Sequence, residues 1–159
     1  MGASGWTYVT PYQGSVEATL NALHEEEFER EYAQDYDSLA ELWADEEFMG
    51  EQGTHSILDI TRVVRTTEPP EAFGSDFSTL RPVPLERVRH HLGTDRPTVE
   101  QFRAAEARYE EKLRLPFTDR RAAEPTLFDE PHIRWTGLYV LLHTDGLPTH
   151  VGIFGYSGD

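Results

Sequence analysis

The chain has 159 residues, a length typical of one domain, and its 38% hydrophobic and 27% charged residues are typical of a globular fold. It contains no cysteine, which excludes disulfide frameworks, thiol catalysis and cysteine-ligated metals. The 29 acidic and 14 basic residues give a net charge of −15, which makes a nucleic-acid backbone or an anionic membrane surface an unfavourable partner.

The first residues have neither the positive nor the apolar region of a secretory signal. No apolar stretch approaches the roughly 18 residues that a membrane-spanning helix needs. We therefore expect a cytoplasmic protein without a membrane partner.

The negative charge is concentrated at one end of the sequence. Residues 1–61 contain 14 acids and one base, whereas residues 62–159 contain 15 acids and 13 bases. Most of the excess lies between Glu17 and Glu51. Such an asymmetry indicates either a solvated helical face that maintains solubility or a docking surface for a basic partner.

The first part of the chain predicts one strand and two helices. Alternating aromatic residues predict a strand over 6–10, and Ser15 is the expected N-cap of a helix that extends to Tyr32. Ser38 and Glu41 form a capping-box pattern for a second helix. Three acids at 45–47 then fall near its C-terminal end, where the helix dipole disfavours them, unless the helix ends before them.

The middle of the chain predicts a strand, a loop and two helices. An apolar run predicts a strand over 55–64, and the Pro- and Gly-containing segment 66–80 is expected to be a surface loop. A short helix over 85–92 ends at Gly93, and a capping box at Thr98 begins a helix that extends to about residue 114.

The last part predicts a β-hairpin. Residues 133–143 and 149–156 are the two strands, with Asp-Gly at 145–146 between them. Leu147 and Pro148 are expected to lengthen the connection to about four or five residues. Gly152 and Gly155 in the return strand indicate a bulge or a close backbone approach.

Strands at both ends and in the middle, with helices between them, predict a single α+β domain over residues 1–159. We expect a small, mostly antiparallel sheet of three to five strands, with helices on one face and the two terminal strands close together.

The histidines give no known catalytic or metal-binding motif. His24 and Glu27 are one helical turn apart, but two ligands alone do not define a metal site. His55 and Asp59 would share one face of the predicted strand, where either residue can meet His143 or His150 as a general acid–base pair. We expect no metal and no cofactor.

Four segments of the sequence resemble short, uncharacterised proteins of actinomycete bacteria: GASGWTYVTPYQ, GTHSILDI, GTDRPT and GYSGD. The resemblance touches both ends of the chain and implies one full-length bacterial domain. It implies no activity, cofactor or catalytic residue.

Three functions of different class are left open. The first is a non-enzymatic, immunity- or antitoxin-like protein that neutralises a basic protein partner through the acidic face of residues 17–51. The second is a small enzyme with His and carboxylate residues in a pocket between sheet and helices, and the third is self-association through an open sheet edge. For the first, the partner-facing residues are Glu25, Glu26, Glu29, Asp35, Asp37, Trp43, Asp45, Glu46 and Glu47, with Tyr32, Tyr36 and Phe48 as further aromatic contacts.

Overall fold

The computed structural model describes residues 3–71, 75–131 and 133–158. Its strands are β1 (Ala3–Pro11), β2 (Arg62–Val63), β3 (Thr79–Pro82), β4 (Thr136–Thr144) and β5 (Leu147–Gly158). Its α-helices are α1 (Val16–Glu31), α2 (Leu39–Ala44), α3 (Glu46–Glu51), α4 (Leu85–Leu92), α5 (Val99–Arg114) and α6 (Phe117–Ala122). Two 3₁₀ turns are η1 (Ile57–Asp59) and η2 (Leu127–Asp129). In the described ranges no helix is long and apolar enough to cross a membrane.

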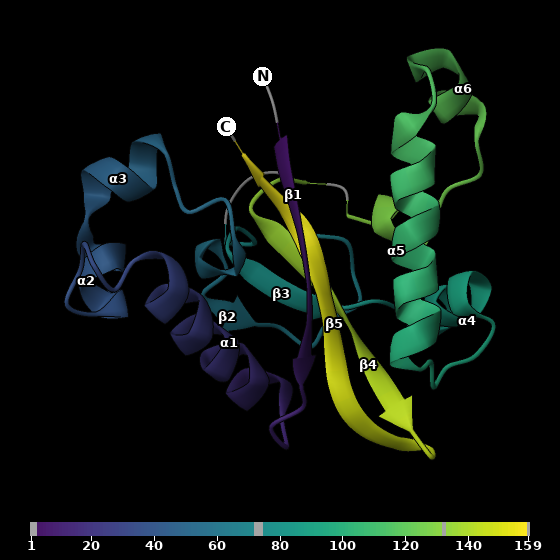
Figure 1. The fold of residues 1–159 in the computed structure, drawn as a ribbon, viewed down its shortest axis with the longest axis horizontal. Coiled ribbons are helices and arrows are strands. Elements are labelled where there is room, and N and C mark those ends of the chain that lie inside the picture. The colour runs from purple at the N-terminus through teal and green to yellow at the C-terminus, as the bar shows by residue number, and fades with distance from the viewer. Residues whose placement is uncertain (1–2, 72–74, 132, 159) are drawn as a thin grey trace.

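The strands form one sheet in the order β1-β5-β4-β3-β2 (Figure 1). This confirms the α+β class, the C-terminal hairpin and the proximity of the terminal strands, because β5 pairs antiparallel with both β1 and β4. The expectation of a mostly antiparallel sheet is wrong, since β3 is parallel to both β4 and β2. The helical segment α4–α6 connects β3 to β4, and a long crossover of this kind returns the chain in the parallel direction.

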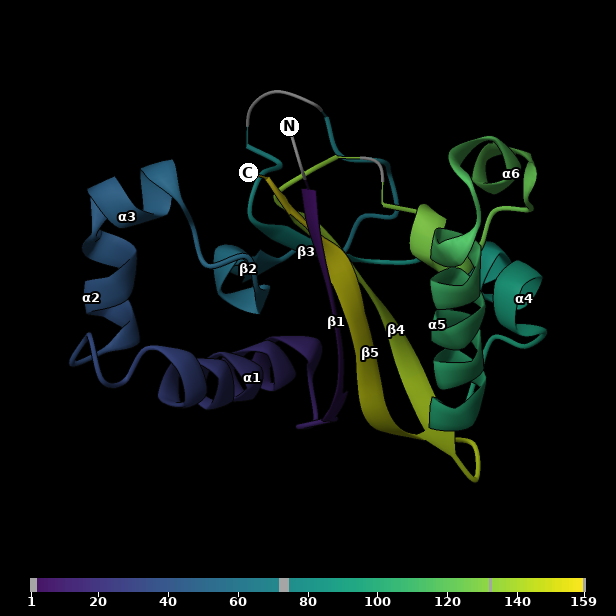
Figure 2. The ribbon, with the colours of Figure 1, turned by 45° about the horizontal axis from the view of Figure 1, so that its top comes forward.

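Helices cover both faces of the sheet, so the expectation of helices on one face is also wrong (Figures 1 and 2). On the α5 side, Phe102 packs with Phe154 of β5 and with residues of α4 and η2. On the α1 side, Leu20 and Leu23 pack with Val151 and Ile153. β5, which lies between β1 and β4, has apolar side chains on both faces of the sheet, and helices therefore bury both of them.

The hairpin turn is shorter than expected. Thr144 pairs with Leu147, which leaves only Asp145 and Gly146 as turn residues, with φ of 51° and 76°. Positive φ at both positions is the signature of a type I′ turn, whose twist matches that of the strands. A register shift lies between Leu142, which is opposite His150, and His143, which is opposite Pro148.

The close backbone approach at Gly152 and Gly155 is confirmed. A Cβ atom added at Gly152 would lie 2.6 Å from the Phe102 ring, and one at Gly155 would lie 2.7 Å from the Trp6 indole. Both glycines are buried, and each lets an aromatic ring lie directly on β5.

The predicted strand over 55–64 is wrong except at Arg62–Val63. His55 has a φ of 51°, and η1 follows it. Side chains here take backbone hydrogen bonds that a strand would make with its neighbour. Ser56 Oγ accepts from the N–H of Leu58, and Asp59 Oδ1 accepts from the N–H of Thr54. The predicted loop over 66–80 ends in β3 at Thr79, and its residues 72–74 lie outside the described ranges.

Candidate functional site

The exposed carboxylates of α1–α3 and their connections form what we call the acidic helical surface. Its exposed residues from the predicted set are Glu25, Glu26, Glu29, Asp35, Asp37, Glu46 and Glu47. None of these carboxylates has an ion pair with another residue in the described part of the chain. Figure 2 shows α1, α2 and α3 on the opposite side of the sheet from α4 and α5.

The face that α1 turns to solvent follows from its apolar spacing. The Ser15 hydroxyl caps the helix by accepting from Ala18 N at 3.0 Å, as predicted. Leu20 and Leu23 then turn one face onto the sheet. At 3.6 residues per turn, Glu25 and Glu29 lie on the opposite face.

Asp45, Glu46 and Glu47 lie at the start of α3. The alternative in which the preceding helix ends before them is therefore the correct one. Asp45 Oδ1 accepts from Phe48 N at 2.9 Å and Oδ2 accepts from the Tyr36 hydroxyl at 2.8 Å. These bonds lower the pKa of Asp45, the backbone N–H contributing most, and the bond to Asp45 raises the pKa of Tyr36 to about 12. The two glutamates lie in the first turn, where the helix dipole favours them.

Trp43 anchors α2 to the body of the protein. Its indole Nε1 donates to the Leu58 carbonyl at 2.9 Å, and its ring meets His24 edge-on with centroids 5.4 Å apart. The side chain is half-buried, so a partner would reach only one part of it.

An open pocket of about 570 Å³ lies inside this acidic region. We call it the aromatic pocket, because Tyr32 and Phe48 line it with ring centroids 6.0 Å apart. Glu51 and His55 also line it. The pocket thus combines two aromatic rings with a carboxylate, a set that suits the side chain of lysine or arginine.

Asp59 is 3% exposed and is held by neutral donors. The Thr54 N–H and hydroxyl donate to Oδ1 at 2.8 and 2.7 Å, and the Ser157 hydroxyl donates to Oδ2 at 2.6 Å. Ser157 also accepts from the Trp6 indole at 3.1 Å. The carboxylate therefore ties the 54–59 segment to the paired strands β1 and β5.

The proposed acid–base set of His55, Asp59, His143 and His150 is not assembled. Asp59 contacts β5 at Ser157, whereas His150 lies at the other end of that strand, opposite Leu142. Seven residues of strand separate the two positions, which corresponds to roughly 23 Å. The backbone N–H of His143 donates to Pro97 at the same far end.

His24 and Glu27 also serve separate partners. His24 Nε2 donates to the Ile60 carbonyl at 2.8 Å, while Glu27 accepts from the Tyr8 hydroxyl and pairs with Arg30. Burial lowers the pKa of His24. The residues that the structure describes contain no group of three or more metal-ligating side chains.

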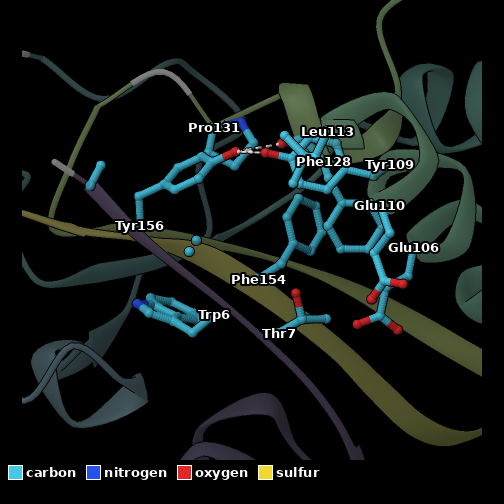
Figure 3. A pocket seen from close by; sticks show the side chains of 13 residues that line it. Trp6, Thr7, Glu106, Tyr109, Glu110, Leu113, Phe128, Pro131, Phe154 and Tyr156 are labelled. Atoms are coloured by element: carbon cyan, nitrogen blue, oxygen red, sulfur yellow. Dashed lines mark hydrogen bonds between the residues drawn. The ribbon is translucent and has the colours of Figure 1, made fainter. Parts of the chain in front are cut away.

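The sheet–α5 pocket, of about 360 Å³, lies between strands β1 and β5 and helix α5 (Figure 3). Its rings are Trp6, Tyr109, Phe128, Phe154 and Tyr156, and its carboxylates are Glu106 and Glu110. It is the pocket between sheet and helix that the sequence left open for an enzyme, but its lining contains no histidine among the residues that the structure describes. The sequence signals for it are the two glutamates one turn apart and the aromatic residues of the last strand.

Two tyrosines close one side of the sheet–α5 pocket. Their hydroxyl oxygens lie 2.7 Å apart, and the Tyr156 hydroxyl donates to the Phe128 carbonyl at 3.1 Å (Figure 3). Since Tyr156 uses its proton on Phe128, Tyr109 is the donor between the two rings. Burial raises the pKa of Tyr156.

Comparisons with protein-family models, with curated proteins and with solved structures gave no match to this chain. The resemblance to short actinomycete proteins therefore stays a prediction, and the function must be argued from the site itself.

Proposed function

We propose that the protein is a non-enzymatic, immunity- or antitoxin-like binding protein that neutralises a basic protein partner through the acidic helical surface. The observation that carries this proposal is the concentration of exposed carboxylates on α1–α3, in a part of the chain where Arg30 is the one base among residues 1–61. In the second part of the chain acids and bases are mixed, and several acids are paired, as in Arg87–Glu130, Arg89–Asp95, Arg103–Glu106 and Lys112–Asp129. On the acidic helical surface Glu17 pairs with Arg65 and Glu31 with Arg30, and the other exposed carboxylates have no such partner in the described ranges.

Unpaired charges of one sign on neighbouring helices repel each other, so their concentration on one surface does not stabilise the free protein. A basic partner converts that repulsion into attraction. Concentrated surface charge raises association rates by about 10- to 1000-fold at low salt and orients the partner before contact.

The aromatic pocket supports the same proposal by offering a place for one buried contact. A lysine or arginine of the partner would lie against Tyr32 and Phe48 with Glu51 at its charged end. A cation on an aromatic face contributes about 0.5–2 kcal/mol, depending on how far it is desolvated. Surface charge would set the rate of association, and this contact the lifetime of the complex.

The test begins with capture of the partner from the native lysate at low and high salt, followed by association kinetics with the captured protein. Replacement of Glu25, Glu26 and Glu29 by lysine should slow association by about tenfold or more at low salt. The matched control replaces Glu100, Glu111 and Glu124, which are equally exposed and lie outside the surface. Both variants change the net charge equally. Equal effects of the two variants, or association indifferent to salt, would overturn the proposal.

The alternative of a small enzyme can be tested at the aromatic pocket, which has both His55 and Glu51 in its lining. A second pocket is also lined by histidines and glutamates, His90, His91, Glu111 and Glu124, together with Arg108 and Lys112. A general acid–base role would require any measured turnover to fall by about 100-fold or more in the His55→Gln variant. Turnover that survives this change removes the alternative for the aromatic pocket.

A further inference from the structure

The two edges of the sheet differ in how they are protected. β2 forms one edge and is two residues long, with the exposed and charged Arg62 in it. β1 forms the other edge and is nine residues long, and its sequence ASGWTYVTP contains no charged residue. Soluble proteins block free edges with short strands, charges, bulges or covering segments, because a long uncharged edge invites another strand. The part of β1 that precedes Pro11 has no charge and no register shift against β5.

The hydrogen-bond alternation along β1 identifies its free backbone groups. Tyr12 N donates to Thr149 O at 2.9 Å, in line with the antiparallel register of β1 and β5. Since bonded positions alternate along an antiparallel pair, even-numbered residues of β1 face β5. Gly5, Thr7 and Val9 then direct their N–H and C=O groups away from the sheet. Pro11, which has no N–H, also falls on this outward set.

The sheet–α5 pocket adjoins this edge. Gly5 and Thr7 belong to its lining, so an added strand would project alternate side chains over the same face (Figure 3). The absence of a side chain at Gly5 keeps the space beside Tyr156 open, because a Cβ there would lie 3.3 Å from that ring.

The charge of the lining selects among the segments that could pair with β1. Glu106 and Glu110 line the pocket, and no lysine or arginine does. Glu106 is engaged by Arg103, whereas Glu110 is exposed and has no ion pair with the residues described. The remaining lining is dominated by aromatic rings, whose faces attract cations and apolar side chains alike.

We propose that β1 binds an extended segment of another protein as a sixth strand, and that the segment's alternate basic and aromatic side chains enter the sheet–α5 pocket. Backbone pairing supplies affinity in this mode, and the pocket supplies specificity. A second copy of this chain fits less well, because its β1 has no basic side chain to offer Glu110 and each copy carries a net charge of −15. The proposal concerns a different surface from the acidic helical surface and does not rest on it.

The probe is a fluorescent nine-residue peptide that carries arginine, phenylalanine and arginine at alternate positions, with threonine and valine between them. Binding should slow amide hydrogen exchange at Gly5, Thr7 and Val9 by about tenfold or more, while exchange in α1–α3 stays unchanged. The control peptide has the same side chains but is N-methylated on the amides that would face β1. This control peptide should bind about tenfold more weakly. Because the protein itself is unchanged, a loss of binding is not due to a change in its folding.

Two protein variants separate the contributions of edge and pocket. Thr7→Pro removes an outward N–H without removing a bond to β5, and Gly5→Leu fills the space beside Tyr156. Each should weaken peptide binding by about tenfold, whereas Glu25→Lys should leave it unchanged if the two surfaces are separate. Equal affinity for the N-methylated peptide, or protection on α1–α3 alone, would overturn the proposal. A dimer by light scattering, with Thr7 and Val9 protected before peptide is added, would replace the proposed occupant by a second copy.

Discussion

The substitution Gly152→Ala tests whether the ring of Phe102 rests directly on strand β5. The added Cβ would lie 2.6, 2.7 and 2.9 Å from three carbons of that ring. Favourable carbon–carbon contacts lie near 3.5–4.0 Å, so the ring must move by about 1 Å. Phe102 is 0% exposed, and neighbouring rings Phe128 and Phe154 lie 5.4 and 6.1 Å from it, which leaves little room. Overpacking of this size costs about 1–3 kcal/mol of unfolding free energy.

Urea denaturation followed by circular dichroism measures that cost. We expect a lower midpoint with an unchanged slope, and a melting temperature reduced by roughly 2–12 °C. The matched control is Gly50→Ala in α3, where the same methyl group meets nothing within 4 Å and should stabilise the protein by about 0.5 kcal/mol. The smaller side chain of Phe102→Leu should make Gly152→Ala less costly in the double variant. If Gly152→Ala and Gly50→Ala have equal effects, the packing argument is refuted.

Three further predictions concern buried polar groups and the hairpin turn. Burial lowers the pKa of His24 from its usual 6.5, so the unfolded chain takes up this proton first and stability falls as pH drops below about 6.5. His24→Gln should flatten the pH profile of unfolding between about pH 5 and 7, and an unchanged profile would contradict this. Ser157→Ala removes a donor to Asp59 and should cost about 1–3 kcal/mol in urea denaturation, whereas a neutral result would mean that water replaces the hydroxyl. Gly146→Ala places a side chain at a φ of 76° and should cost about 1–2 kcal/mol. The control is Asp145→Asn at a φ of 51°, which should be neutral or slightly stabilising in the same assay, and equal effects of the two changes would contradict the turn assignment.

Signals that act within a few residues were predictable from the sequence. Ser15 and Thr98 cap α1 and α5 with their own side chains, and Gly93 ends α4 with a φ of 77°. Each of these depends only on the backbone of one helical turn, so the local sequence is sufficient.

The errors arose where local patterns compete with distant contacts. The apolar run over 55–64 reads as a strand, yet Asp59 is drawn inward by Ser157 from the far end of the chain. Similarly, the parallel pairing of β3 depends on where the helical crossover docks, which no local pattern specifies.

The two candidate sites also differ in whether local sequence was enough to predict them. Exposed acids on α1 and α3 could be predicted, because charge density is a property of the sequence itself. The sheet–α5 pocket could not, since Thr7 and Tyr109 line the same pocket only after β1 and α5 have packed on β5. The role of Asp45 as a cap depended on one helix boundary, which is the least certain feature of a sequence pattern.

The position of β5 has a consequence for how the protein is made. This strand lies between β1 and β4, yet the ribosome synthesises it after all the other strands. Trp6 and Ser157, which share a hydrogen bond, are 151 positions apart. At about 5–20 residues per second, β1 waits on the order of ten seconds for its only neighbour in the sheet. During that interval the native partners that β1 can find are those translated soon after it, such as Leu20 and Leu23 of α1, which share a core cluster with Trp6. Folding of the sheet is completed only after translation of its last strand.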